Sequence, residues 1–151
     1  RYPFLYVKYY FDTNSDGYLS KKERNNATLI SAKYWKISSF KGIKYFPNLK
    51  YLDCGHNNLT SLDFSGNKKL EKLNCDYNKL TALSTGNTPK LRTLYCGNNS
   101  LKTLIVSKSR SLQKLFCKPN KLTKLDVRKN KKLTAKGGII DADKGVKIIK
   151  K

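Results

Sequence analysis

The residues that most clearly suggest chemistry in this chain lie near its amino end. Carboxylate and amide side chains stand at every second position from Asp12 through Asn14 to Asp16, Gly17 stands at the sixth of 12 positions, and Glu23 is the last. This spacing allows carboxylate and amide oxygens to converge on one hard cation such as Ca²⁺, while the glycine permits a sharp turn. The expected ligands are the side chains of Asp12, Asn14, Asp16 and Glu23 and the backbone carbonyl of Tyr18, with Ser20 acting directly or through water.

The same 12 positions match the EF-hand calcium loop, and the residues before them predict a helical arm. Apolar residues at helical spacing form one face of that arm: Phe4, Val7, Tyr10 and Phe11. We expect weak calcium affinity, because the chain has a single loop of this kind and several lysines close to it. The alternative is a metal-free structure in which Ser20 and Glu23 form a capping box for the following helix.

Most of the chain repeats with a constant period of 21 residues. One leucine returns at every step, at positions Leu49, Leu70, Leu91, Leu112 and Leu133. Four successive blocks follow the order L-x-x-L-x-C-x-x-N-x-L-x-x-L. This is the leucine-rich repeat pattern, with cysteine in its third apolar position.

Each block forms one coil, in which Leu52 and Cys54 point inward from a short strand and Asn57 turns the chain. A single coil cannot bury its leucines, so the coils stack with their strands parallel. The repeated asparagine then forms a column that satisfies backbone groups at the bends. Only eight residues remain for the return, which favours an extended segment over a helix. We predict an α/β leucine-rich repeat solenoid, a right-handed superhelix of mostly parallel β-structure with few helices, behind a helical EF-hand-like cap.

The chain divides into three parts of one compact domain. We predict the EF-hand-like amino-terminal cap over residues 1–26 and a carboxy-terminal capping coil over residues 133–151. Five repeats lie between them, over residues 27–48, 49–69, 70–90, 91–111 and 112–132. The cysteines occupy one inward position of successive coils, which predicts buried free thiols: Cys54, Cys75, Cys96 and Cys117. Their spacing does not suit a zinc site, and one strained disulfide between neighbouring coils is the alternative.

Three features of the sequence together resemble bacterial surface leucine-rich repeat proteins of internalin-like layout. They are the cap from Asp12 to Glu23, the junction from Gly42 to Leu49, and cysteine-bearing coils such as residues 70–75. The resemblance covers nearly the whole chain, and it implies a secreted or surface-attached binding protein. The chain starts at Arg1 rather than at a methionine, which suggests a mature or trimmed product.

Side chains between the inward ones point out of the strands and form the concave face of the stack. Tyr51, Tyr95 and Phe116 place aromatic area there among polar neighbours, as is common in recognition surfaces. Ordinary strand propensity also favours these aromatic residues and is the alternative explanation. The predicted partner-binding residues are Tyr51, Asp53, Lys72, Asn74, Asp76, Tyr95, Lys114 and Phe116.

The chain is strongly basic, with 32 lysines and arginines against 10 acidic residues and a formal charge of +22. Lysine supplies 27 of the 32, and it acts as a hydrated point charge rather than as the fork with which arginine reads phosphate. We therefore expect no specific nucleic acid partner. The field attracts polyanions at low salt, so the alternative function is a basic adhesion module for anionic polymers: cell-wall polymer, glycosaminoglycan or nucleic acid.

Catalysis is the least supported class of function. His56 is the only histidine, and the sequence contains no recognisable nucleophile with its base, paired acid and base, or glycine-rich phosphate loop. No stretch approaches the ~20 apolar residues of a membrane span. We therefore predict a noncatalytic, monomeric module, secreted or on a bacterial cell surface. It binds a protein or glycan partner on its concave sheet and holds one calcium ion in its cap.

Overall fold

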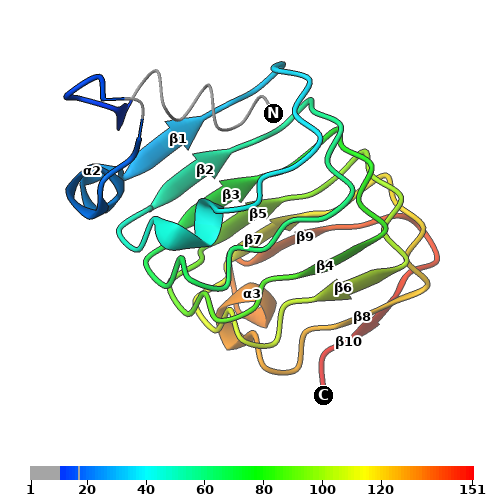
Figure 1. The fold of residues 1–151 in the computed structure, drawn as a ribbon. Helices are drawn as coiled ribbons and strands as arrows, with labels where there is room; N and C mark the ends of the chain where they lie inside the picture. Colours follow the sequence, from blue (N-terminus) through cyan, green and yellow to red (C-terminus); the bar gives the residue numbers. More distant parts are fainter. Residues whose placement is uncertain (1–10, 17) are drawn as a thin grey trace.

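The computed structural model describes residues 11–16 and 18–151, which form a stack of coils around a leucine-rich interior (Figure 1). The chain enters the stack through the short helix α2 (Lys21–Asn26). The predicted leucine-rich repeat solenoid with parallel strands and few helices is confirmed. Phe4, Val7 and Tyr10 of the predicted helical arm, and Gly17 of the loop, lie outside the described residues.

A six-stranded parallel sheet, here called the concave sheet, forms one face of the stack. Its strands follow the order of the coils: β1 (Leu29–Ser31), β2 (Tyr51–Asp53), β3 (Lys72–Asn74), β5 (Thr93–Tyr95), β7 (Lys114–Phe116) and β9 (Ile139–Asp141). Leu52, Leu73, Leu94 and Leu115 are direct partners across the central strands, which is the register that a 21-residue repeat requires. The last step is longer, because the chain passes through α3 (Lys131–Thr134) before Ile140 pairs with Leu115.

Two further pairs of three-residue strands form the return side of the later coils. β4 (Ala82–Ser84) pairs with β6 (Thr103–Ile105), and β8 (Lys124–Asp126) pairs with β10 (Lys147–Ile149), both in parallel. These pairs confirm the prediction that the returns are extended, while the first coil contains the 3₁₀ turn η1 (Ile43–Tyr45). In the part of the chain that the structure describes, no helix has the length and apolar character needed to cross a bilayer.

The interior combines the repeated leucines with the cysteines. All four cysteines are free and 0% exposed, which confirms the prediction of buried free thiols. Burial raises the pKa of Cys117 to about 12, and it also raises the pKa values of Cys54, Cys75 and Cys96. The thiols therefore remain protonated and pack as small hydrophobic groups.

A column of asparagines holds the corner that follows the concave sheet. The Nδ2 of Asn78 donates to the Cys54 and Cys75 carbonyls, both at 3.0 Å. Its Oδ1 accepts from the Leu59 N–H at 2.9 Å, so one side chain joins two neighbouring coils. The predicted structural role of the column is confirmed, and its members are Asn57, Asn78, Asn99 and Asn120.

A second column of buried polar side chains holds the opposite corner and was not predicted. Asn67 donates to two carbonyls of the preceding coil, both at 2.9 Å, and Asn130 does the same at 2.9 and 2.8 Å. Between them, the hydroxyls of Thr88 and Ser109 lie 2.9 Å apart. These positions also recur every 21 residues, but their residue types differ, so the column lacks the uniform signature of the first.

We expect Asn78→Ala to lower the free energy of unfolding by about 2 kcal/mol, because the buried Leu59 N–H loses its acceptor and three carbonyls lose a donor. Asn87→Ala is the matched control, since Asn87 is exposed at a return turn, and we expect a change below about 0.5 kcal/mol. Urea denaturation followed by circular dichroism measures both. Equal losses in the two variants would contradict the structural role of the column.

Candidate functional site

Six of the eight residues predicted to bind a partner line one hollow in the concave sheet. The hollow has a volume of about 450 Å³ and extends over β1, β2, β3 and β5. The alternation of the strands carries these side chains outward while the central leucine of each strand stays buried. The six are Tyr51, Asp53, Lys72, Asn74, Asp76 and Tyr95.

Phe116 extends the aromatic part of this site, whereas Lys114 lies apart from it. The rings of Phe116 and Tyr95 are stacked, with centroids 4.7 Å apart and an interplanar angle of 5°. The Nζ of Lys72 lies 5.5 Å from the centroid of the Tyr95 ring, within the range of a cation–π contact. Lys114 is exposed at the start of β7 and is not among the lining residues.

Two aspartates give the hollow fixed hydrogen-bond acceptors. Asp76 accepts from the Gly97 N–H at 2.6 Å, and Asp53 accepts from the Gly55 N–H at 3.1 Å. The next coil requires glycine at position 97, because a Cβ there would collide with the backbone carbonyl of Lys118. Partial burial raises the pKa of Asp76, and the neighbouring charge of Asp53 adds to this effect. The site therefore combines aromatic walls with acceptors in set positions.

A ladder of stacked rings, here called the aromatic ladder, lies at the end of the same coils. His56 stacks between Tyr34 and Tyr77, with ring centroids 4.3 and 4.2 Å away. All three residues have positive φ, at 62°, 53° and 54°, a conformation that is costly for an aromatic residue and easier for asparagine. Asn98 takes the equivalent position in the next coil, with a φ of 49°.

Lys33 joins the aromatic ladder to the hollow. Its Nζ lies 5.6 Å from the centroid of the Tyr34 ring and 3.9 Å from a carboxylate oxygen of Asp53. The ladder was not among the predicted site residues. Aromatic residues at positions 34, 56 and 77 follow the period of the coils, and this spacing was the available signal. Tyr34 lies in the first coil, where the repeat pattern is loose. Its ring stacks on that of His56 only because the two coils are neighbours in the stack.

The predicted calcium loop brings three of its ligand side chains together. Oδ1 of Asp12 and Oδ1 of Asn14 both accept from the Asp16 N–H, at 3.2 and 3.3 Å. Asn14 also donates to the Asp16 carboxylate at 2.8 Å, and the Tyr18 N–H donates to the same carboxylate at 2.8 Å. These side-chain oxygens are of the type that Ca²⁺ prefers.

Glu23, the fifth predicted ligand, is turned toward the start of α2. Its Oε2 accepts from the Ser20 N–H at 2.8 Å, and its Oε1 accepts from the N–H and hydroxyl of Thr13 at 2.7 and 2.9 Å. The backbone and hydroxyl of Ser20, followed by Thr13, lower the pKa of Glu23 to about 2. This is the capping box that the sequence offered as an alternative, and it is present. Across residues 11–16 and 18–151, no three acidic, histidine or cysteine side chains converge as a metal site.

Residues 47–87 match the family model for leucine-rich repeats, in two copies. The chain has the leucine-rich repeat fold. It is similar to a solved structure described as the functional domain of InlJ from Listeria monocytogenes, which includes a cysteine ladder. The two share 28% identity and a TM-score of 0.55, over 86% of this chain and 32% of that chain.

This similarity supports an internalin-like leucine-rich repeat protein. The chain spans about a third of the length of the InlJ structure that it matches. No curated protein matches the chain. The description of the InlJ domain names a cysteine ladder, and in this chain the four buried cysteines lie in successive coils.

Proposed function

We propose that the chain is a noncatalytic binding module, secreted or on a bacterial cell surface, whose concave sheet recognises a protein or glycan partner. The observation that carries this proposal is the hollow of about 450 Å³, in which aromatic walls stand beside Asp53, Asp76 and Lys72. Aromatic rings supply contact area at low entropic cost, and the polar groups supply direction. The leucine-rich repeat fold and the similarity to the InlJ domain support a binding module at a surface.

The aromatic ladder enlarges the proposed surface beyond the hollow. Tyr34 and Tyr77 are 67% and 50% exposed, which leaves ring area available to a partner. Backbone strain at three successive coils persists only where the surrounding structure supports it, and it commonly marks functional positions. A partner that lies across β1, β2 and β3 would therefore reach both the hollow and the ladder. The proposed module acts as a monomer.

We expect the double variant Tyr51→Ala, Tyr95→Ala to bind its partner at least about tenfold more weakly, because it removes two aromatic walls of the hollow. Tyr45→Ala is the matched control: Tyr45 is 62% exposed but lies on η1, away from the concave sheet. A protein and glycan array read at low salt and at ~0.5 M salt identifies the ligand, since specific contacts survive screening.

Retention of one ligand at high salt, lost in the double variant and kept in Tyr45→Ala, supports the proposed site. Loss of every ligand at high salt would contradict recognition by the hollow. Circular dichroism of each variant checks that the fold is intact.

We also propose that the cap holds one Ca²⁺ with weak affinity. The side-chain oxygens of Asp12, Asn14 and Asp16 and the Tyr18 carbonyl fit the chemistry of this ion. Glu23 would have to turn from its capping position to close the site, because its oxygens accept from Thr13 and Ser20. That exchange of hydrogen bonds for a ligand, together with nearby lysines, is the physical reason for weak binding.

Calorimetry at millimolar Ca²⁺ should show a binding heat for the unaltered chain and none for Asp12→Ala. Asp126→Ala is the matched control, since it removes the same charge from an exposed position on β8, and it should keep the heat. Absence of heat for the unaltered chain would remove the calcium site from the account.

A further inference from the structure

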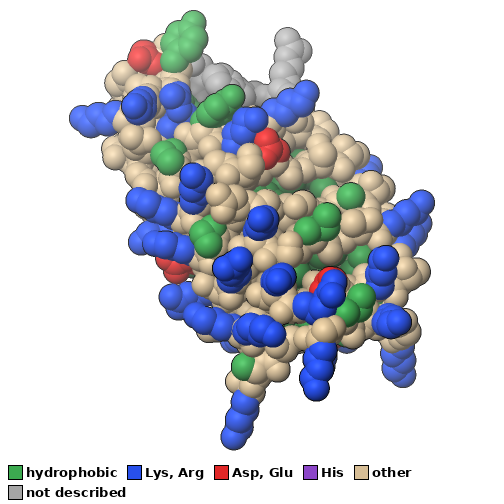
Figure 2. Space-filling view, turned by 90° about the horizontal axis from the view of Figure 1, so that it is seen from below, with side chains coloured by type: hydrophobic (Ala, Val, Ile, Leu, Met, Phe, Trp, Pro, Cys, Tyr) green, Lys and Arg blue, Asp and Glu red, His purple; other side chains and the backbone are tan. Residues whose placement is uncertain are grey.

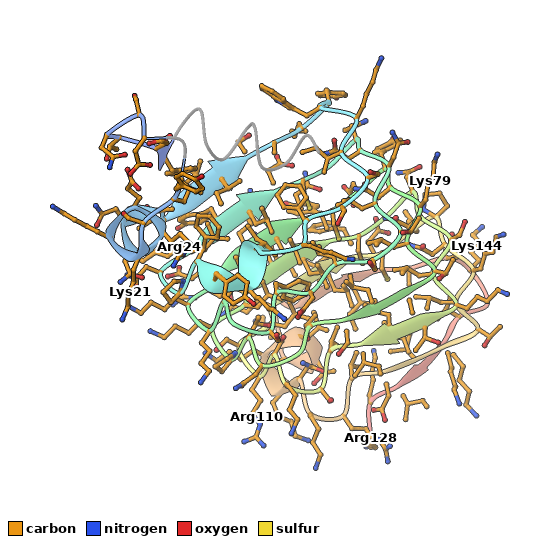
Figure 3. All side chains as sticks on the ribbon, in the orientation of Figure 1. Lys21, Arg24, Lys79, Arg110, Arg128 and Lys144 are labelled. Atoms are coloured by element: carbon orange, nitrogen blue, oxygen red, sulfur yellow. The ribbon has the colours of Figure 1, made fainter. Side chains whose placement is uncertain are left out.

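A charged surface runs along the corner where each return segment leads into the next strand of the concave sheet. We call it the basic edge. Figure 2 views the molecule from this side, where lysine and arginine side chains are spread over the surface with few acidic groups among them. Figure 3 shows Arg110 and Arg128 at this edge, whereas Lys79 and Lys144 lie at the opposite one. The basic edge is defined here by six exposed residues: Lys68, Lys69, Lys90, Lys108, Arg110 and Lys131.

The period of the coils arranges these charges in rows along the stack. Lys68, Arg110 and Lys131 fall at one position of their repeats, and Lys69 and Lys90 fall at the next. Residues 21 apart meet side by side, as the 2.6 Å bond from Lys69 Nζ to Asn48 Oδ1 shows. At ~4.8 Å per coil, the cations from Lys68 to Lys131 extend over ~14 Å.

Few acidic residues lie near the cations of the basic edge. Asp63 pairs with Lys44 at 3.2 Å, and Asp126 pairs with Arg128 at 2.6 Å, so two nearby carboxylates are already matched. Glu71 lies between basic residues of the neighbouring coils. Among the residues that the structure describes, none of the six cations that define the basic edge forms an ion pair. Their charge is therefore available to an external anion.

The backbone beneath the basic edge is held in place. The buried column of Asn67, Thr88, Ser109 and Asn130 lies at this corner, and each member is 0% exposed. Its hydrogen bonds connect successive coils, so the rows of cations keep their spacing. A ligand that matches the rows meets a preorganised surface and avoids part of the cost of ordering it.

We propose that the basic edge binds a linear acidic polysaccharide lying along the stack. Lysine acts as a hydrated point charge, so rows of lysines suit a polymer that repeats its anionic groups and does not need the bidentate geometry of an arginine fork. Single-stranded nucleic acid needs a series of aromatic platforms for its bases, whereas among the described residues beside the edge Tyr45 is a single exposed ring. The edge is a corner of the coils, where α3 has only four residues, and it offers no long helix to enter a duplex groove.

This binding would use a different face from the hollow of the concave sheet. A polysaccharide held on the basic edge leaves Tyr51 and Tyr95 uncovered, because they lie on β2 and β5. The two activities can therefore be lost separately.

Two variants of equal charge test the proposal. The edge variant carries Lys68→Glu, Lys90→Glu and Arg110→Glu, and the control variant carries Lys79→Glu, Lys121→Glu and Lys144→Glu on the opposite corner. Each lowers the formal charge of +22 by six, and all six residues are exposed. The probe is heparin, a sulfated linear polysaccharide, titrated at ~0.1 M salt, where exposed charges still interact over ~10 Å.

We expect the edge variant to bind heparin at least about tenfold more weakly than the unaltered chain, and the control variant less than about threefold more weakly. Equal weakening in both variants would show attraction by net charge alone and overturn the assigned surface. Tighter binding of a DNA duplex than of heparin by the unaltered chain would overturn the polysaccharide as partner. Circular dichroism confirms that both variants are folded before they are compared.

Discussion

Hydrogen bonds from buried polar side chains to the backbone at the two corners of each coil are the interaction on which the rest of the structure depends. A coil of 21 residues must turn sharply, and each turn leaves backbone groups that neither strand can satisfy. Asn78 and its equivalents satisfy them at one corner, and the column from Asn67 to Asn130 does so at the other. Because each member of the two columns also bonds to a neighbouring coil, the corners fix the register in which the leucines stack.

With the interior fixed by a repeated pattern, the outer positions are free to differ from coil to coil. On the concave sheet this freedom produces the hollow beside Tyr51 and Tyr95 and the strained aromatic ladder at its end. On the opposite corner it produces the basic edge. The same scaffold thus presents one surface suited to directional contacts and another suited to repeated charge, and the period of the coils sets the spacing of both.

Structural features could be predicted from the sequence where the same residue type recurs at one position of every repeat. The leucine and cysteine positions predicted the parallel register, and Asn57 with its equivalents predicted the first corner column. The outward alternation of the strands identified six residues of the hollow. The second corner column was missed because asparagine, threonine and serine share its positions, and the aromatic ladder was missed because Tyr34 lies in the loosest repeat. In the cap, one spacing predicts both a calcium loop and a capping box, and spacing alone does not place Glu23, which accepts from the Ser20 N–H.

Native-state hydrogen exchange at the Leu59 amide tests the central claim most directly. This N–H donates to the side chain of Asn78 rather than to the backbone. Backbone hydrogen bonds between stacked strands therefore do not protect it from exchange. We predict that the Leu59 amide exchanges as slowly as the Cys75 amide, which donates to the Tyr95 carbonyl at the end of β3. Exchange as fast as that of the exposed Asn87 amide would contradict the claim that buried side-chain amides hold the coils in register.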